Sequence, residues 1–171
     1  MVEPLPTFDE VREQMRSPKP PVGCRVVEFD HGEVRRSATV LFDGLQGWYI
    51  DDGTQVEVRG SDECVLFDSD GTLERVGPGL GYVHSNAWAK TPIEPRRMLL
   101  DEARGRVLRR DEVNGRSVVV VEFSGLRRPD DDVVFEMQVD AATGVVLAMS
   151  RPDLGLVLRV DDLRVGSVEG R

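Results

Sequence analysis

Alternating hydrophobic and polar positions dominate the last third of the chain, over residues 133–164. Phe135, Met137 and Val139 share one phase of this alternation, and polar side chains occupy the other phase. A period of two residues indicates a strand that buries one face. The pattern resumes after an Asp-x-x-x-Gly turn and again after a Pro/Gly turn, so this segment predicts three antiparallel strands.

The N-terminal residues predict a short amphipathic helix. Thr7 and Glu10 have the spacing of a capping box, in which each side chain bonds to the backbone N–H of the other residue. Phe8, Val11 and Met15 follow at helical spacing, and a proline ends the run. The apolar stripe of this helix needs a partner, and a sheet face is the expected one.

Strand-like segments follow one another through the next part of the chain, with short turns between them. The pairs Asp52-Gly53 and Asp70-Gly71 favour tight hairpins, because glycine adopts a positive φ at no steric cost. Connections this short exclude parallel crossovers and predict an antiparallel meander. The predicted strands are 22–29, 34–42, 46–50, 55–59, 64–67 and 73–76.

A second helix is predicted to begin after Thr91. Thr91 would cap it, Pro92 would take its first position, and Glu94 would complete a capping box. Gly105 is a suitable stop at its C-terminal end.

Strands return after this helix, at 106–110 and 117–123, around the hairpin pair Asn114-Gly115. The four valines at 118–121 are apolar on both faces, which predicts a central strand with both sides covered. Asp161-Asp162 interrupts the last alternation and predicts a β-bulge. The whole pattern gives about ten or eleven strands and two short helices in one sheet, a mainly β (α+β) fold.

Length and composition fit one soluble domain. A chain of 171 residues is expected to form a single domain spanning 1–171, with residues 167–171 as a frayed tail. The net charge of −9 disfavours nucleic acid as a partner, and no apolar run reaches the length of a membrane span. No apolar leader or lipobox is visible, which favours a cytoplasmic protein; an envelope location stays open if the natural chain begins earlier.

Cys24 and Cys64 lie in different predicted strands. Two small buried thiols are the expected arrangement. A cross-strand disulfide stays open, because it requires the two strands to be neighbours. A metal site is disfavoured, since His31 and His84 lack ligand spacing to either cysteine, and no cofactor is expected.

Two segments carry a resemblance to a known family: residues 109–123, which hold the Asn-Gly hairpin, and residues 137–147, which contain Val-Asp-x-x-Thr-Gly. With the N-terminal helix, the long meander and the Pro-started second helix, they resemble the LolA-like superfamily of lipoprotein carriers and lipid-binding relatives. The resemblance covers nearly the whole chain. It implies a curved antiparallel sheet forming an open half-barrel, two short helices on its concave side, and an apolar cavity between them.

Residues 65–73 also match the first motif of the haloacid-dehalogenase-type phosphatases, a strand that ends in D-x-D-G-T. In such an enzyme Asp68 would be the nucleophile and Asp70 the general acid, with Mg²⁺ neutralising the phosphate. That chemistry needs a parallel sheet with a helix after the motif, whereas residues 73–76 have a strand pattern. A plain Asp-Gly hairpin is therefore favoured, and the phosphatase is kept as an alternative.

The favoured function is non-enzymatic binding of an apolar ligand, such as a lipid or an acyl or isoprenoid group, or of a hydrophobic partner segment. The basis is a curved sheet with helices on one face and no catalytic set. If side chains fill the concavity, a regulatory protein-interaction module with a filled core becomes the expected role. The candidate ligand-binding residues are Trp48, Phe67, Tyr82, His84, Trp88 and Met98.

Overall fold

The computed structural model describes residues 4–60, 64–68, 70–71, 73–76, 86–95, 104–124 and 134–166. Within these residues, eleven strands form one sheet. The elements in chain order are α1 (Phe8–Arg16), β1 (Val22–Asp30), β2 (Glu33–Phe42), β3 (Trp48–Asp51), β4 (Gln55–Arg59), β5 (Cys64–Asp68), β6 (Leu73–Val76), α2 (Ala87–Lys90), β7 (Arg104–Val113), β8 (Arg116–Ser124), β9 (Val134–Asp140), β10 (Val146–Arg151), the 3-10 turn η1 (Pro152–Leu154) and β11 (Leu156–Val165).

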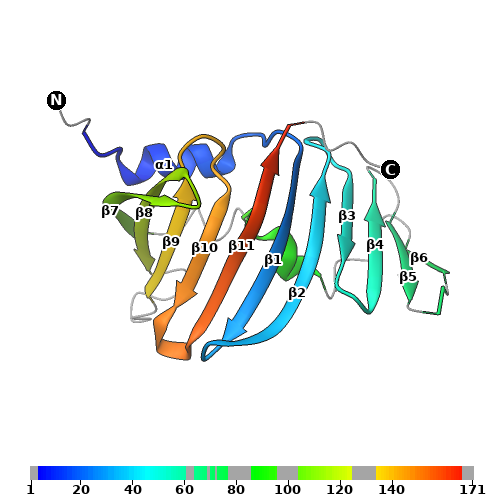
Figure 1. Cartoon of the computed structure of the whole chain (residues 1–171). Helices are drawn as coiled ribbons and strands as arrows, with labels where there is room; N and C mark the ends of the chain where they lie inside the picture. Colours follow the sequence, from blue (N-terminus) through cyan, green and yellow to red (C-terminus); the bar gives the residue numbers. More distant parts are fainter. Residues whose placement is uncertain are drawn as a thin grey trace.

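The sheet consists of two meanders that meet at its centre (Figure 1). The strand order is β6-β5-β4-β3-β2-β1-β11-β10-β9-β8-β7, so β1 to β6 form one half and β7 to β11 the other. β1 pairs antiparallel with β11, and the first and last strands of the chain thereby join the two halves. β6 and β7 lie at opposite ends of the sheet and do not pair with each other. The fold is the expected open half-barrel.

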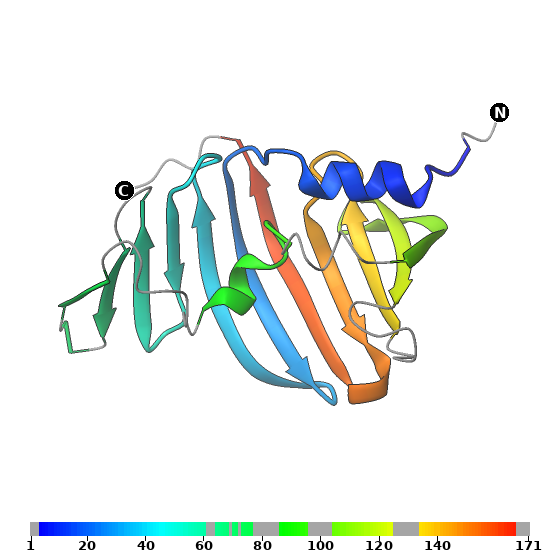
Figure 2. The same cartoon turned by 180° about the vertical axis from the view of Figure 1, so that it is seen from behind.

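Both helices lie on the same, concave face of the sheet (Figure 2). α1 crosses the half that contains β7 to β10, and α2 crosses β2, β1 and β11. The predicted capping box of α1 is present: the Thr7 N–H donates to Glu10 Oε2 at 2.6 Å, and the Glu10 N–H donates to the Thr7 hydroxyl at 3.2 Å. Val11 and Met15, at 1% and 2% exposed, form the buried stripe of α1.

Two clusters of buried side chains lie along the sheet. The smaller cluster packs α1 against β8, β9 and β10 through residues such as Val121 and Met137. The larger cluster takes in residues of β1, β2, β3 and β11, together with Val118 and Val120 of β8 and Leu147 of β10, and it includes Ala89 of α2 and Ile93 after it. Among the described residues, α1 therefore packs on the smaller cluster, and α2 with Ile93 packs on the larger one.

The second helix differs from its prediction. α2 ends at Lys90, and Thr91 closes this helix instead of beginning one, since its hydroxyl donates to the carbonyl of Ala87 at 3.2 Å. The predicted capping box at Thr91 is therefore wrong. Most of the segment predicted to be helical, residues 96–103, lies outside the described residues.

The strands of the last third largely match their predictions. Asp162 lies on a bulge, with φ 53°, where β11 gains one residue relative to β1, so the predicted bulge is confirmed. The valines at 118–121 are all at most 2% exposed, and both faces of β8 are therefore covered. β8 is the second strand from one end, however, so its predicted central position is wrong. Gly105 lies inside β7, where a Cβ would approach the Phe8 ring to 2.3 Å, and does not stop a helix.

Candidate binding site

A buried ion pair lies on the concave face beneath α2. Glu57 on β4 is 1% exposed, and its carboxylate accepts a hydrogen bond from the ammonium of Lys90, the last residue of α2. The same ammonium lies 5.7 Å from the ring centre of Trp48, a buried residue of β3. A buried carboxylate without a partner is strongly destabilising. The pair therefore ties the end of α2 to β4.

Trp88 of α2 makes a second contact between a ring and a cation. The guanidinium of Arg36 on β2 lies 4.3 Å from the centre of the Trp88 ring, within the range of cation–π attraction. Arg36 also donates to Glu28 Oε2, from Nε at 3.2 Å and from Nη2 at 2.7 Å. The two predicted tryptophans, Trp48 and Trp88, thus lie on the same face of the sheet, each beside a cation.

The segment after α2 closes the interior of the half-barrel. The Pro92 carbonyl accepts a hydrogen bond at 2.8 Å from the N–H of Val146, where a bulge in β10 interrupts its pairing with β9. Ile93 is fully buried in the larger cluster. A cavity of about 10 Å³ remains between this segment, Met15 of α1 and Met149 of β10. That space holds no more than about one water molecule, so side chains fill the concavity at this place.

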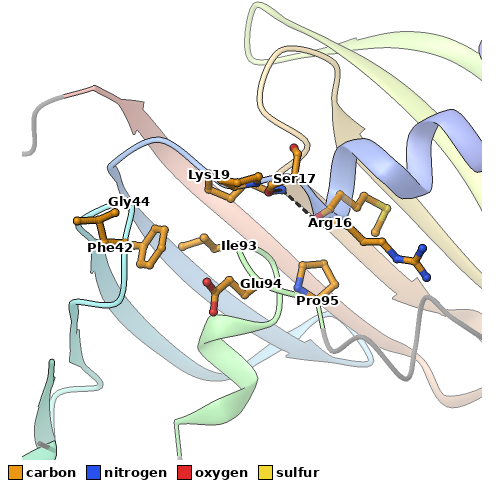
Figure 3. A pocket seen from close by; sticks show the side chains of 11 residues that line it. Arg16, Ser17, Lys19, Phe42, Gly44, Ile93, Glu94 and Pro95 are labelled. Carbon is orange, nitrogen blue, oxygen red and sulfur yellow. Dashed lines mark hydrogen bonds between the residues drawn. The ribbon is translucent and has the colours of Figure 1, made fainter. Parts of the chain in front are cut away.

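A larger groove opens at the end of the half-barrel where β1 begins and β2 ends (Figure 3). Its volume is about 680 Å³, within the range of ligand-binding pockets. Phe42 and Ile93 form an apolar floor, and both side chains are buried. The walls are residues 15–19 at the end of α1, residues 44–45 in the turn between β2 and β3, and residues 94–95. Segments from three separate parts of the sequence therefore build this groove.

The turn between β2 and β3 presents Leu45 at the mouth of the groove. Asp43 Oδ1 accepts hydrogen bonds from the N–H groups of Leu45 at 2.7 Å and Gly47 at 2.9 Å, and these donors lower the pKa of Asp43 from 3.8. Gly44 has φ +86°, and a Cβ there would lie 2.9 Å from Pro21 Cδ, so the turn requires glycine. Leu45 is 81% exposed. A single exposed leucine is ordinary, but this one extends the apolar floor outward.

Lys19 faces the groove from the loop after α1, and its charge is already engaged. The side chain is buried, and its ammonium donates to the carbonyl oxygens of Gln14 at 3.0 Å, Met15 at 2.8 Å and Ser17 at 2.7 Å. These bonds use all three protons of the ammonium and satisfy the last carbonyls of α1. Burial lowers the pKa of Lys19 to about 8, against the opposing effect of the Glu94 charge.

Glu94 faces Lys19 across the groove, with Ile93 between them (Figure 3). In the part of the chain that the structure describes, its carboxylate forms no hydrogen bond or ion pair. The surrounding protein desolvates this carboxylate and raises the pKa of Glu94 above 4.5, while the charges of Lys19, Lys90 and Arg59 act in the opposite direction. Glu94 is therefore a charged acceptor available at the groove surface.

Of the candidate ligand-binding residues that the structure describes, none lines this groove. Phe67 on β5 is 38% exposed, and its pairing with Val56 places it on the face away from the helices. Tyr82, His84 and Met98 lie outside the described residues. The two tryptophans lie deeper on the concave face, under and within α2, and stay candidate residues.

The D-x-D-G motif lies on an antiparallel hairpin. β5 ends at Asp68 and pairs with β6, and Gly71 has φ 80° and donates its N–H to the Asp68 carbonyl at 2.8 Å. The Asp68 side chain accepts from Gln55 Nε2 at 3.1 Å. The motif therefore forms the Asp-Gly hairpin that the sequence favours. The strand β6 follows it, at the place where a phosphatase needs a helix. Among the described residues, no cluster of three His, Cys, Asp or Glu side chains could hold a metal ion.

Cys24 and Cys64 are free, buried thiols, as expected. β1 and β5 are separated by three strands. At about 4.8 Å per strand the two cysteines lie roughly 19 Å apart, too far for a disulfide. Burial raises the pKa of both thiols, that of Cys24 to about 12.

The charged residues of the concave face and the groove were not predicted. One signal in the composition points to two of them. Of the 22 Lys and Arg residues, only Lys19 and Lys90 are lysine, and both make the interior contacts described above. In a chain that otherwise uses arginine, a lysine marks a place where a compact ammonium fits and a planar guanidinium does not.

No family model and no curated protein sequence matches the chain, but solved structures do. MucB superposes with a TM-score of 0.58 and 17% identity, over 95% of this chain and 60% of MucB. The Mycobacterium tuberculosis lipoprotein LppX superposes with a TM-score of 0.50 and 12% identity, over 91% of this chain and 96% of LppX. The chain has a LolA-like fold. At such low identities the likeness extends to the fold alone.

The LolA-like fold also occurs in the complex structure of MucA and MucB from Pseudomonas aeruginosa. That structure matches with a TM-score of 0.51 and 16% identity, over 96% of this chain and 57% of the matched chain. The present chain thus spans about 60% of the length of MucB. Among its described residues, no helix has the length and apolar character needed to cross a membrane.

Proposed function

We propose that this protein is a non-enzymatic binding protein that holds a hydrophobic segment of a partner protein in the groove between α1, the β2–β3 turn and residues 93–95. The observation that carries the proposal is the contrast between two spaces that described residues line on the concave side. The interior cavity beside Met149 measures about 10 Å³, whereas the groove at the open end measures about 680 Å³. Close packing at the interior place and open space at the groove favour a protein-interaction role over the storage of a long lipid chain.

The shape and chemistry of the groove support a peptide segment as the occupant. Phe42 and Ile93 lie buried beneath the groove, and Leu45, Pro18 and Pro95 provide its accessible apolar surface. Its rim carries charge at Lys19 and Glu94. Protein interfaces combine an apolar centre with a polar rim in this way. The structure of MucB in complex with MucA shows that one protein of similar fold associates with another protein.

A lipid or acyl ligand is the alternative occupant, and the likeness to the lipoprotein LppX is the observation that favours it. The groove volume fits a drug-sized molecule or a short acyl chain. The same likeness leaves the expected cytoplasmic location without support.

Site-directed photo-crosslinking tests the proposal. Leu45→Cys places a reactive thiol at the mouth of the groove, while the native thiols are buried and Cys24 has a raised pKa. A benzophenone maleimide attached there should crosslink to one hydrophobic segment of a partner protein in cells of the source organism. The matched control is Leu154→Cys. Leu154 is an exposed leucine in the η1 turn after β10, at the end of the sheet opposite to the groove.

The crosslinked product and its mass separate the possible occupants. A defined peptide attached at position 45, and absent at position 154, supports the proposal. A lipid adduct at position 45, reproduced by native mass spectrometry and organic extraction, would replace the partner segment with a lipid. Equal labelling at both positions would show that the groove has no special affinity.

A further inference from the structure

The charged residues of the groove differ in how fully their charges are used. Arg16 forms an ion pair with Glu13 at 2.8 Å, and Lys19 donates all three ammonium protons to carbonyl oxygens. Glu94 has no such partner in the described part of the chain. Glu94 is exposed at the groove surface, so an incoming cation can reach its carboxylate, and Glu94 is the position in the groove where such a charge would be recognised.

The cations around Glu94 cannot readily turn toward it. Lys19 is held by the end of α1, and Lys90 is held by the buried carboxylate of Glu57. Arg59 on β4 is the third cation that lowers the pKa of Glu94, through its charge. Among the described residues, two of the three cations near Glu94 are therefore committed to other acceptors, and neither of these two binds its carboxylate.

We propose that the partner segment carries a lysine or arginine next to its apolar residues, and that Glu94 binds this cation while the accessible apolar side chains Leu45, Pro18 and Pro95 contact the apolar part. This inference rests on the proposed function. The net charge of −9 adds long-range attraction for a basic segment and disfavours an acidic one.

Peptide binding measured by fluorescence anisotropy tests the inference. The probes are short, terminally blocked, labelled peptides with a run of leucines followed by lysine, glutamine or glutamate. The wild-type protein should bind the lysine peptide about threefold more tightly than the glutamine peptide, as expected for an ion pair at an exposed carboxylate, and the glutamate peptide least tightly. Glu94→Gln should bind the lysine and glutamine peptides with equal affinity.

Glu33→Gln is the matched control, because it removes the same charge at the opposite end of the β1–β2 hairpin. This variant should keep the preference for lysine. Burial raises the pKa of Glu94 above 4.5. The preference of the wild type for the lysine peptide should therefore decline as the pH falls toward this pKa, because protonation removes the charge that binds the cation. Equal melting temperatures of the three proteins establish that all are folded.

Two results would overturn the inference and leave the proposed function standing, and a third would overturn both. Equal binding of the lysine, glutamine and glutamate peptides to the wild type would leave the groove as a purely apolar site. A lysine preference that persists in Glu94→Gln would assign the recognition to another residue. Failure of the wild type to bind any peptide would refute both the peptide-binding function and the role of Glu94.

Discussion

Replacing Lys90 by methionine tests whether the ion pair beneath α2 holds the segment that closes the half-barrel. Methionine preserves the length of the side chain and removes its charge. Glu57, which is 1% exposed, then keeps a carboxylate without its ammonium partner. Removing one member of a buried pair is far more destabilising than removing the pair, because the remaining charge is left without compensation.

The structure sets the size of the expected effect. Losing one partner of a buried pair costs about 3–5 kcal/mol. The lower end applies here, because the Lys90 side chain is 14% exposed and water can reach the vacated position. We therefore expect Lys90→Met to reduce the free energy of unfolding by about 3 kcal/mol. For a chain of this length, that corresponds to a fall of roughly 6–12 °C in Tm.

The apolar double variant Lys90→Met/Glu57→Leu should unfold within about 1 kcal/mol of the wild type, because it leaves no buried charge. The assay is urea unfolding followed by tryptophan fluorescence, since Trp48 lies 5.7 Å from the Lys90 ammonium. Arg106→Met is the control: it breaks an ion pair with Glu122 in which the two side chains are 71% and 34% exposed, and should change stability by less than about 1 kcal/mol.

Two results would contradict this reasoning. If Lys90→Met is no more destabilising than Arg106→Met, water compensates the Glu57 carboxylate and the pair does not hold α2. If the double variant is as unstable as the sum of its two single variants, the two side chains act independently. In either case the closure of the interior depends on the apolar contacts of Ile93 and not on charge.

Three further predictions follow from packing and local structure. Cys24 and Cys64 should not react with DTNB at pH 8 until the protein unfolds, since a pKa of about 12 leaves about one Cys24 thiol in ten thousand ionised; rapid reaction in the native state would contradict this. Gly144→Ala should destabilise by about 2 kcal/mol or more in urea, because φ is +71° and the Cβ would lie 2.4 Å from the Gln14 carbonyl oxygen; a loss below about 0.5 kcal/mol would mean that α1 shifts freely. Thr7→Ala should lower the free energy of unfolding by about 1 kcal/mol through loss of the cap, and an unchanged Tm would show that the first turn frays.

Periodicity predicted the strands but not which face of each strand is buried. In β4 the alternation of apolar and charged residues suggests inward valines, yet Glu57 is 1% exposed and Val58 is 40% exposed. The register explains the inversion: Glu57 lies opposite Ile50, which is fully buried on the concave face. The pairing of the strands determines which face of the sheet each residue occupies. Lys90, whose ammonium compensates the buried charge of Glu57, lies 33 residues away in the sequence.

The second helix was misplaced because its signals admit two interpretations. A threonine followed by proline and glutamate matches the start of a helix. The same Thr91 ends α2, where its hydroxyl satisfies the Ala87 carbonyl. The bond from the Val146 N–H to the Pro92 carbonyl then holds the chain against the sheet. This long-range contact depends on a bulge in β10, which no local pattern near Thr91 reveals.

The candidate site was less accessible to sequence reasoning than the fold. Trp48 and Trp88 were among the candidate ligand-binding residues and lie on the concave face, but neither lines the groove. Lys19 and Glu94 come from distant segments, and their meeting depends on where α1 ends and where the chain leaves α2. No spacing rule links them, because the turns that join these segments to the sheet determine their separation.

The groove lies where the described segments on the concave face, α1 and the chain from α2 to Pro95, leave a gap between them. α1 covers the strands from β7 to β10 and ends before Pro18, where the Lys19 ammonium satisfies its last carbonyls. The chain after α2 covers the other half up to Ile93. The remaining wall is the turn that Asp43 holds rigid through two backbone N–H groups. A groove bounded by hydrogen-bonded backbone is formed before any partner arrives, so the ordering cost of binding falls on the partner segment. Variants that loosen the turn, such as Asp43→Ala, should therefore weaken binding with little change in the unfolding free energy of the sheet.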